Sequence, residues 1–140
     1  MVDRALLADR IATVRDATAR IRSTLPGSVE ALVADRTARE VVVLNLFVAI
    51  QACLDLATHW LADEGSAVPA TYGDVFTALG DRGVLDRALA ERLASASGFR
   101  NLIAHQYGAL DWPRVYEIAG SDLGDLEALC ATLARRAGAA

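Results

Sequence analysis

The sequence has few of the residues that staple a fold or interrupt a helix. Its 140 residues include only two cysteines and three prolines. Cys53 and Cys130 lack the CxxC spacing of a zinc site, and two thiols are too few for a disulfide framework. We therefore expect both cysteines to be reduced and buried, with no disulfide and no bound metal.

Positive charge is also scarce. The chain has 14 basic side chains, all of them arginine, against 18 acidic ones, which gives a formal net charge of −4. Broad, sequence-independent binding of duplex nucleic acid normally requires a basic face. The composition therefore argues against a DNA-binding protein, and any RNA must be held by a local group of arginines.

Signals for secretion and membrane insertion are weak as well. The chain begins "MVDRALLADR", which is charged from its third residue and lacks the apolar core of a signal peptide. Residues 41–62 are strongly apolar but are interrupted by four polar side chains, Asn45, Gln51, Asp55 and His59. A central aspartate costs about 3 kcal/mol in a bilayer. We expect a cytoplasmic protein, with no membrane contact, in which this segment is a buried helix.

Apolar side chains are abundant and make up 54% of the chain. A chain of this length can bury one core without staples, so we expect residues 1–140 to form a single domain. The apolar residues recur at helical spacing, and Pro26 with Gly27 ends the first helix. Its stripe consists of Leu7, Ile11, Val14, Thr18, Ile21 and Leu25.

A second, long helix is predicted from residue 29 to about residue 64, with Ser28 as its N-cap. Its apolar surface, from residue 41 to residue 61, is wider than one partner helix can cover. A helix that is hydrophobic nearly all round has a second partner. Another subunit is one candidate for that partner, which points to a homodimer.

Further helices follow a short loop. Thr71 and Asp74 have the spacing of a capping box, before a short helix that closes at Gly80. The next helix ends near Gly108, and Asp111 is the predicted N-cap of a helix with proline in its first turn. The apolar stripe of the helix before Gly108 consists of Leu85, Leu89, Leu93, Ala96, Phe99 and Ile103.

The last amphipathic helix is predicted over residues 121–136. Gly120 and Gly124 leave it open whether this helix is continuous with the one that precedes it. The chain shows helical periodicity throughout and no strand pattern. It therefore predicts an all-α fold, an antiparallel bundle of four to five helices.

The stretch "GFRNLIAHQYGAL", residues 98–110, places polar side chains on a helix that otherwise packs. At 100° per residue, Tyr107 lies about 20° from Arg100, and both fall on the apolar stripe. His105 lies about 140° from Arg100, on the face that it shares with Asn101. Either the helix ends near His105, or two copies of the motif meet across a symmetric interface.

These residue types suit the cleavage of a phosphodiester. A histidine such as His105 exchanges protons near neutral pH, so it can take the proton of a ribose 2′-hydroxyl or protonate the leaving oxygen. Arg100 can hold the phosphate and stabilise charge in the transition state. Tyr107 offers a positioning hydroxyl, and Asn101 could orient the imidazole. The chemistry needs no metal and no cofactor. A buried, structural Arg-His-Tyr network is the alternative interpretation.

The pattern R-x-x-x-x-H-x-Y, from Arg100 through His105 to Tyr107, resembles the signature of HEPN-domain ribonucleases, and specifically of the HepT-like toxins. The stretches "GFRNLIAHQYGALDWPRVYEI" and "TYGDVFTALGDRGVL" resemble the same family in their order of elements. The resemblance covers nearly the whole chain, with the first helix as its least diagnostic part.

The resemblance implies a HEPN-like bundle that is a homodimeric, metal-independent endoribonuclease. Arg100 and His105 of both subunits would line one cleft, with Asn101 and Tyr107 in support. It also implies a partner, a minimal nucleotidyltransferase antitoxin called MntA, which neutralises the toxin by AMPylation of Tyr107, as in type VII-like toxin–antitoxin pairs. The substrate would be RNA, with transfer RNA among the candidates. The runner-up function is a noncatalytic HEPN module that binds a nucleotidyltransferase and presents substrate or nucleotide to it.

Two polar groups on the long helix have open interpretations. Gln51, Asp55 and His59 share one face, and they either form a hydrogen-bonded seam or extend the cleft and orient His105. Arg36 and Arg39 form either a solvated patch or a set of RNA phosphate contacts.

Three aromatic side chains could stack on an RNA base. They are Trp60, Trp112 and Tyr116. Their spacing favours packing in the core instead.

Overall fold

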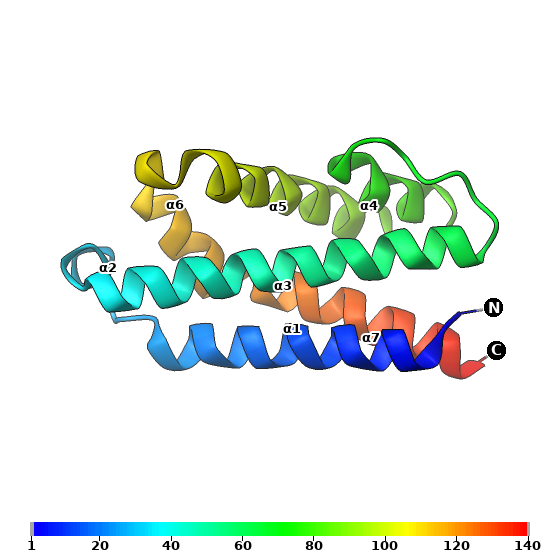
Figure 1. The fold of residues 1–140 in the computed structure, drawn as a ribbon, viewed down its shortest axis with the longest axis horizontal. Coiled ribbons are helices and arrows are strands. Elements are labelled where there is room, and N and C mark those ends of the chain that lie inside the picture. Colours follow the sequence, from blue (N-terminus) through cyan, green and yellow to red (C-terminus); the bar gives the residue numbers. More distant parts are fainter. Residues whose placement is uncertain (1, 140) are drawn as a thin grey trace.

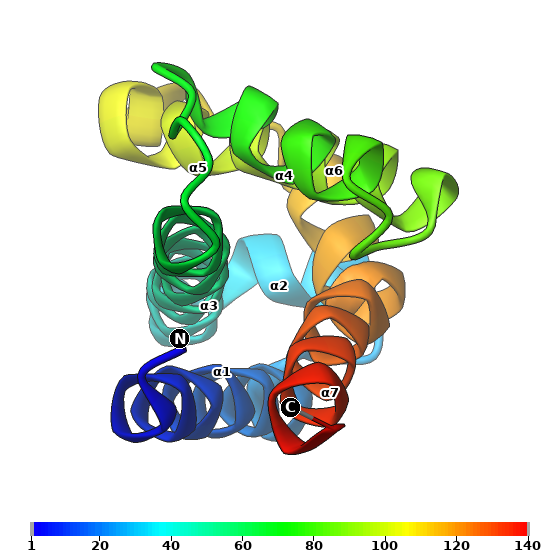
Figure 2. The same cartoon turned by 90° about the vertical axis from the view of Figure 1, so that its right-hand side faces the viewer.

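Four long helices run along the length of the molecule in alternating directions (Figure 1). They are α1 (Arg4–Thr24), α3 (Arg36–Asp63), α5 (Arg87–Gln106) and α7 (Leu123–Ala139). The end-on view in Figure 2 places them around one shared interior. The computed structural model describes residues 2–139, and that range contains helices and no strand. The predicted all-α, antiparallel bundle is confirmed.

Three short helices complete the bundle, namely α2 (Val29–Ala34), α4 (Tyr72–Asp81) and α6 (Trp112–Glu117). α4 packs against α5, and α2 packs against α6 at the end of the bundle where α1 stops. The Tyr116 hydroxyl donates to the Pro26 carbonyl oxygen at 3.0 Å, which ties α6 to the turn between α1 and α2. This end of the molecule holds several of the residues discussed below.

Side-chain caps begin most of the helices. Ser28 accepts from the Ala31 amide at 3.1 Å, and Asp111 accepts from the Arg114 amide at 3.4 Å, so both predicted caps are confirmed. Thr71 is the N-cap of α4, as predicted, but the reciprocal side-chain bonds of a capping box are absent. Thr71 makes no cap bond, because its hydroxyl donates instead to the Asp74 carboxylate at 2.7 Å.

The predicted helix from residue 29 to residue 64 is also wrong in one respect, because it is two helices. Asp35 interrupts it with an extended backbone, at φ −112° and ψ 98°, and its carboxylate accepts from the Ala38 amide at 3.1 Å. An aspartate in this position starts a new helix, since it satisfies an amide that has no partner within the helix. The bend lets α2 leave the axis of α3 and pack against α6.

Two other boundaries follow the sequence more closely. α5 ends at Gln106 and passes into a single 3-10 turn, η1 (Tyr107–Ala109), which contains the predicted stop at Gly108. A π-helical turn, η2 (Ile118–Asp122), joins α6 to α7. The sequence left it open whether the chain stays helical across Gly120 and Gly124. The structure shows that α6 and α7 are continuous, with a locally wider turn at η2.

α3 supplies much of the core. It is the one helix among residues 2–139 that is long and apolar enough to cross a membrane by length and composition alone. Core helices of soluble proteins pass the same test, and 56% of its most apolar window is buried inside the fold. The expected buried helix is thus found, with part of its apolar surface still uncovered.

Both cysteines are free and buried, as predicted. Cys53 lies on α3 and Cys130 on α7, and the two thiols are neighbours inside the core. The contact with the Cys130 thiol, together with burial, raises the pKa of Cys53 well above its usual value. Cys53 is therefore an inert thiol, since the reactive form of cysteine is the thiolate.

Candidate functional site

Arg100 is held in a defined place between three helices. Its Nε donates to the Gln51 side-chain oxygen at 2.8 Å, and one terminal nitrogen donates to Asn101 Oδ1 at 3.2 Å. Its Cζ lies 4.8 Å from the ring centre of Phe47 on α3 and 4.9 Å from that of Tyr72 on α4. These bonds use two of the five N–H donors of the guanidinium, so the others remain open to a ligand.

The partner of Arg100 is itself fixed by a polar seam along α3. The Gln51 amide nitrogen donates to Asp55 Oδ1 at 3.1 Å, and Asp55 Oδ2 lies 3.4 Å from Nε of Arg10 on α1. Because the amide donates to Asp55, its oxygen is turned toward Arg100. The seam predicted from Gln51, Asp55 and His59 is confirmed for Gln51 and Asp55 and wrong for His59, and it holds Arg100 and does not reach His105. His59 is exposed and makes no hydrogen bond among residues 2–139.

His105 lies on the opposite side of α5. The helix is regular from Arg87 to Gln106, so His105 lies about 140° around its axis from Arg100. Its side chain is exposed and has no hydrogen bond or ion pair within the described range. Asn101 makes no hydrogen bond to the imidazole within the described range, and its Oδ1 accepts from Arg100 instead. Leu102, 45% exposed, lies on the same outer face as His105.

Tyr107 does not share the stripe of Arg100, and this prediction is wrong. The backbone of Gln106 leaves the helix at φ −138° and ψ 39°, so the rotation of an ideal helix no longer applies to the next residue. Tyr107 begins η1 instead, and its side chain is 46% exposed. Its phenol is open to another protein.

An open hollow of about 400 Å³ lies beside Tyr107, and we call it the Tyr107 hollow. It is lined by Val33, Arg36, Arg39, Glu40, Tyr107, Gly108 and Trp112. The two arginines of the predicted patch thus lie with the motif tyrosine. Sequence reasoning missed this association, because the lining comes from α2, α3, η1 and α6 and no local pattern connects them.

Two electrostatic contacts lie along the wall of the Tyr107 hollow. Arg36 Nε lies 2.7 Å from Glu40 Oε1, and this hydrogen bond, together with the charge of Glu40, raises the pKa of Arg36. Arg39 donates to the carbonyl oxygen of Val33, and its Cζ lies 5.6 Å from the ring centre of Trp112.

The three aromatic candidates for base stacking separate in the structure. Trp60 is buried in the core, and Tyr116 is anchored by its hydroxyl to the Pro26 carbonyl. Both are packing residues, as their spacing favoured. Trp112 is partly exposed and lies in the Tyr107 hollow, where it remains available to a ligand.

The fold and the site define a class of protein. It is a helical bundle that presents an arginine, a histidine and a tyrosine from one helix end. Residues 14–133 match the Ribonuclease HepT-like family, and the chain therefore belongs to that family. The resemblance drawn from the R-x-x-x-x-H-x-Y pattern is confirmed.

Two relatives are similar in sequence. The mRNA nuclease HepT of Shewanella oneidensis is 28% identical over 122 residues, which cover 87% of this chain and 91% of the relative. The tRNA nuclease HepT of Aphanizomenon flos-aquae is 33% identical over 66 residues, which cover 47% of this chain and 45% of the relative.

Two solved structures are similar in fold. One is a chain of a toxin–antitoxin complex with AMP-PNP, with a TM-score of 0.87 and 25% identity, covering 94% of this chain and 98% of that one. The other is a chain from the tri-AMPylated Shewanella oneidensis HEPN toxin in complex with its MNT antitoxin. Its TM-score is 0.86 and its identity 27%, over 96% of this chain and 99% of that one.

Proposed function

We propose that this chain is the toxin of a toxin–antitoxin pair, an endoribonuclease that works without a metal and is neutralised by AMPylation of Tyr107. The observation that carries the proposal is the preset guanidinium of Arg100, which Gln51 and two aromatic rings hold in place, while His105 is exposed on the opposite side of the same helix. The relatives named as mRNA and tRNA nucleases support RNA as the substrate class. The tri-AMPylated HEPN toxin in complex with its MNT antitoxin, among the structural relatives, supports the regulation.

The cleavage step follows from the two side chains. His105 removes the proton of a ribose 2′-hydroxyl, and the 2′-oxygen forms a bond to the adjacent phosphorus. The bond from phosphorus to the 5′-oxygen of the next nucleotide breaks, and that oxygen takes a proton from water, to which the His105 imidazolium then returns its own proton. Arg100 donates to the non-bridging oxygens as their charge grows. The products are a 2′,3′-cyclic phosphate and a free 5′-hydroxyl.

A homodimer supplies both groups to one phosphate. Within one chain Arg100 faces α3 and α4 while His105 faces outward, so one copy cannot direct both at the same atom. Uncovered apolar side chains lie close to both groups. Leu44 is 62% exposed on the face of α3 that also carries Phe47 and Gln51. A second copy that covers Leu44 and Leu102 would bring its own His105 toward Arg100.

Neutralisation acts on the same end of the molecule. Tyr107 is exposed on η1, so a nucleotidyltransferase of the MntA type can reach its hydroxyl. An added AMP is bulky and anionic, and it opposes an RNA phosphate both sterically and by charge. Arg36 and Arg39, next to Tyr107, are the proposed RNA phosphate contacts that this charge would occupy.

The test is cleavage of mixed cellular RNA by the purified protein in EDTA. The wild type is compared with His105→Ala and Arg100→Ala, and the intact mass of each protein is recorded. We expect fragments with 2′,3′-cyclic phosphate ends from the wild type, and losses of about a hundredfold or more in the variants. No cleavage at unmodified mass would contradict the proposal and favour the noncatalytic HEPN module. No cleavage with an added AMP mass would identify the neutralised toxin.

A further inference from the structure

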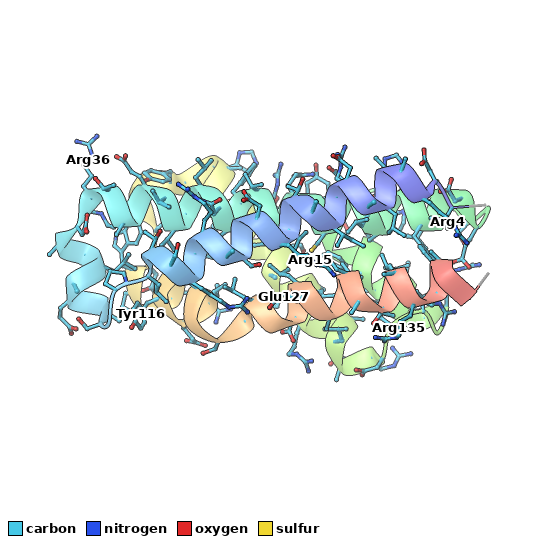
Figure 3. All side chains as sticks on the ribbon, turned by 90° about the horizontal axis from the view of Figure 1, so that it is seen from below. Arg4, Arg15, Arg36, Tyr116, Glu127 and Arg135 are labelled. Atoms are coloured by element: carbon cyan, nitrogen blue, oxygen red, sulfur yellow. The ribbon has the colours of Figure 1, made fainter. Side chains whose placement is uncertain are left out.

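The Tyr107 hollow lies away from the core, at one end of the bundle. Arg36 marks this end in Figure 3, and Arg135 lies at the opposite end of the long axis. The volume of about 400 Å³ falls within the range of about 300–1,000 Å³ typical of small-ligand sites. A nucleotide unit is a ligand of this size class.

The charge of the hollow is not explained by helix stability. Arg36 and Arg39 lie within the first four residues of α3, at the positive end of the helix macrodipole, where basic side chains are unfavourable. The chain as a whole is acidic, with a net charge of −4. Two arginines in this place therefore suit a bound anion, and the planar guanidinium matches the geometry of phosphate as well as that of carboxylate.

One of these arginines has a built-in competitor. Glu40 neutralises Arg36 through the contact at 2.7 Å, so a phosphate must displace or share that carboxylate. Removal of the Glu40 charge would leave Arg36 freer to bind an anion.

The hollow also offers an aromatic surface, the ring of Trp112, which lies against Arg39. Arg39 is held by the Val33 carbonyl and lies over the Trp112 ring at 5.6 Å. A stacked guanidinium and indole form a platform of the kind that nucleotide bases use without sequence preference. The arrangement thus combines a base platform with a phosphate contact, in reach of one hydroxyl, that of Tyr107.

We propose that the Tyr107 hollow is a binding site for a nucleoside monophosphate, and that the adenylate carried by Tyr107 itself fills it in the neutralised toxin. The proposal rests on the proposed AMPylation. In that step Tyr107 Oη forms a bond to the α-phosphorus of ATP, the bond from that phosphorus to the β-bridging oxygen breaks, and pyrophosphate leaves. The phenol proton passes to a base or to water.

The arrangement explains how one modification blocks a substrate of the same chemistry. In the unmodified chain Arg36 and Arg39 are available to an RNA phosphate. In the modified chain the attached phosphate lies beside Arg36 and the adenine against Trp112, so the place is filled by an intramolecular competitor. The adenylate is then shielded from enzymes that would remove it, because the hollow holds it against the protein surface.

The first part of the test uses free 5′-AMP and the unmodified protein. Binding is followed on the indole N–H signal of Trp112 by NMR. We expect Arg36→Gln and Arg39→Gln to weaken AMP binding about tenfold each, and Glu40→Gln to strengthen it a few-fold. Arg135→Gln, a matched loss of one exposed arginine, should leave the affinity unchanged. AMP that shifts no signal of the hollow, or an affinity that is the same in all variants, would overturn the proposal.

The second part uses the protein after reaction with ATP and an MntA-type nucleotidyltransferase. Intact mass first shows whether the protein carries AMP, and peptide mass spectrometry shows whether Tyr107 is the modified residue. An absent mass gain would refute the proposed regulation without touching the first part. Release of AMP by an added phosphodiesterase is then timed. We expect release about tenfold faster from Arg39→Gln and Trp112→Leu than from wild type and Arg135→Gln.

Equal release rates would overturn the proposal. If the same variants raise the KM for RNA while release stays unchanged, the hollow is an RNA subsite only, and the adenylate lies elsewhere. Unchanged thermal unfolding of Arg39→Gln and Glu40→Gln serves as the folding control, since both positions are on the surface of α3.

Discussion

Arg100 and Tyr107 belong to one short motif, yet their surroundings are opposite in kind. Arg100 is partly buried, bonded to Gln51 and stacked between two rings that come from different helices. Tyr107 stands on a 3-10 turn beyond the end of α5, with nearly half of its side chain in solvent. The contrast suggests a division of roles. A group that stabilises a transition state must be held in position before the substrate binds. A group that another protein modifies must be accessible to that protein.

The largest expected effect is the loss of RNA cleavage when Arg100, the preset residue, is changed. Arg100→Lys keeps the positive charge but loses the planar group that donates to Gln51 and stacks on Phe47 and Tyr72. We expect RNA cleavage to fall about a hundredfold. The AMP affinity of the Tyr107 hollow should not change. A lysine variant with near wild-type cleavage would show that the fixed geometry of Arg100 is unimportant.

A smaller effect is expected at Gln51, which positions Arg100 without touching RNA. Gln51→Leu removes the acceptor for Arg100 Nε, and we expect kcat to fall about tenfold with little change in KM. Asn45→Leu is the matched control. Asn45 is also a partly buried amide on α3, but it donates only to the Val41 carbonyl of its own helix. Equal losses in both variants would mean that a general disturbance of α3 is responsible.

The smallest expected effect is a loss of stability at the start of α3, beside the Tyr107 hollow. Asp35→Ala removes the cap of α3, and we expect a loss of about 1 kcal/mol in the free energy of unfolding. For a chain of this size that corresponds to a melting temperature lower by about 3 °C in calorimetry. The frayed start of α3 carries Arg36 and Arg39, so AMP binding should weaken while the Arg100 contacts persist. A cleavage loss as large as that of Gln51→Leu would argue against the independence of the two regions.

Local signals in the sequence were enough for most of the fold. The stop at Pro26-Gly27, the caps at Ser28 and Asp111, and the end of α5 before Gly108 each depend on neighbours a few residues away. The break at Asp35 was missed, because aspartate also occurs inside helices and neither proline nor glycine marks the position. The bend at Asp35 is accompanied by the packing of α2 on α6, a contact between distant segments that no local pattern contains.

The site was predictable in its residues but not in its contacts. The motif identified Arg100, His105 and Tyr107, and helical geometry correctly separated the first two. The hydrogen bond that Arg100 donates to Gln51 joins positions 49 apart in sequence. Tyr107 and Arg36, which line one hollow, are still farther apart in the chain. Such pairs depend on how α3 and α5 are aligned in the bundle. The predicted position of Tyr107 was wrong because the backbone of Gln106 is not helical, so the rotation of an ideal helix does not extend to Tyr107.

A mixture of two inactive subunits gives the most direct test of the account. Arg100→Ala and His105→Ala chains are unfolded together, refolded, and assayed for RNA cleavage in EDTA. If Arg100 of one chain works with His105 of the other, a mixed dimer keeps one intact pair, and its activity should be about half that of the wild-type dimer. Each variant alone should remain inactive. A mixed dimer that forms but shows no more activity than its parents would contradict the pairing of the two residues across subunits.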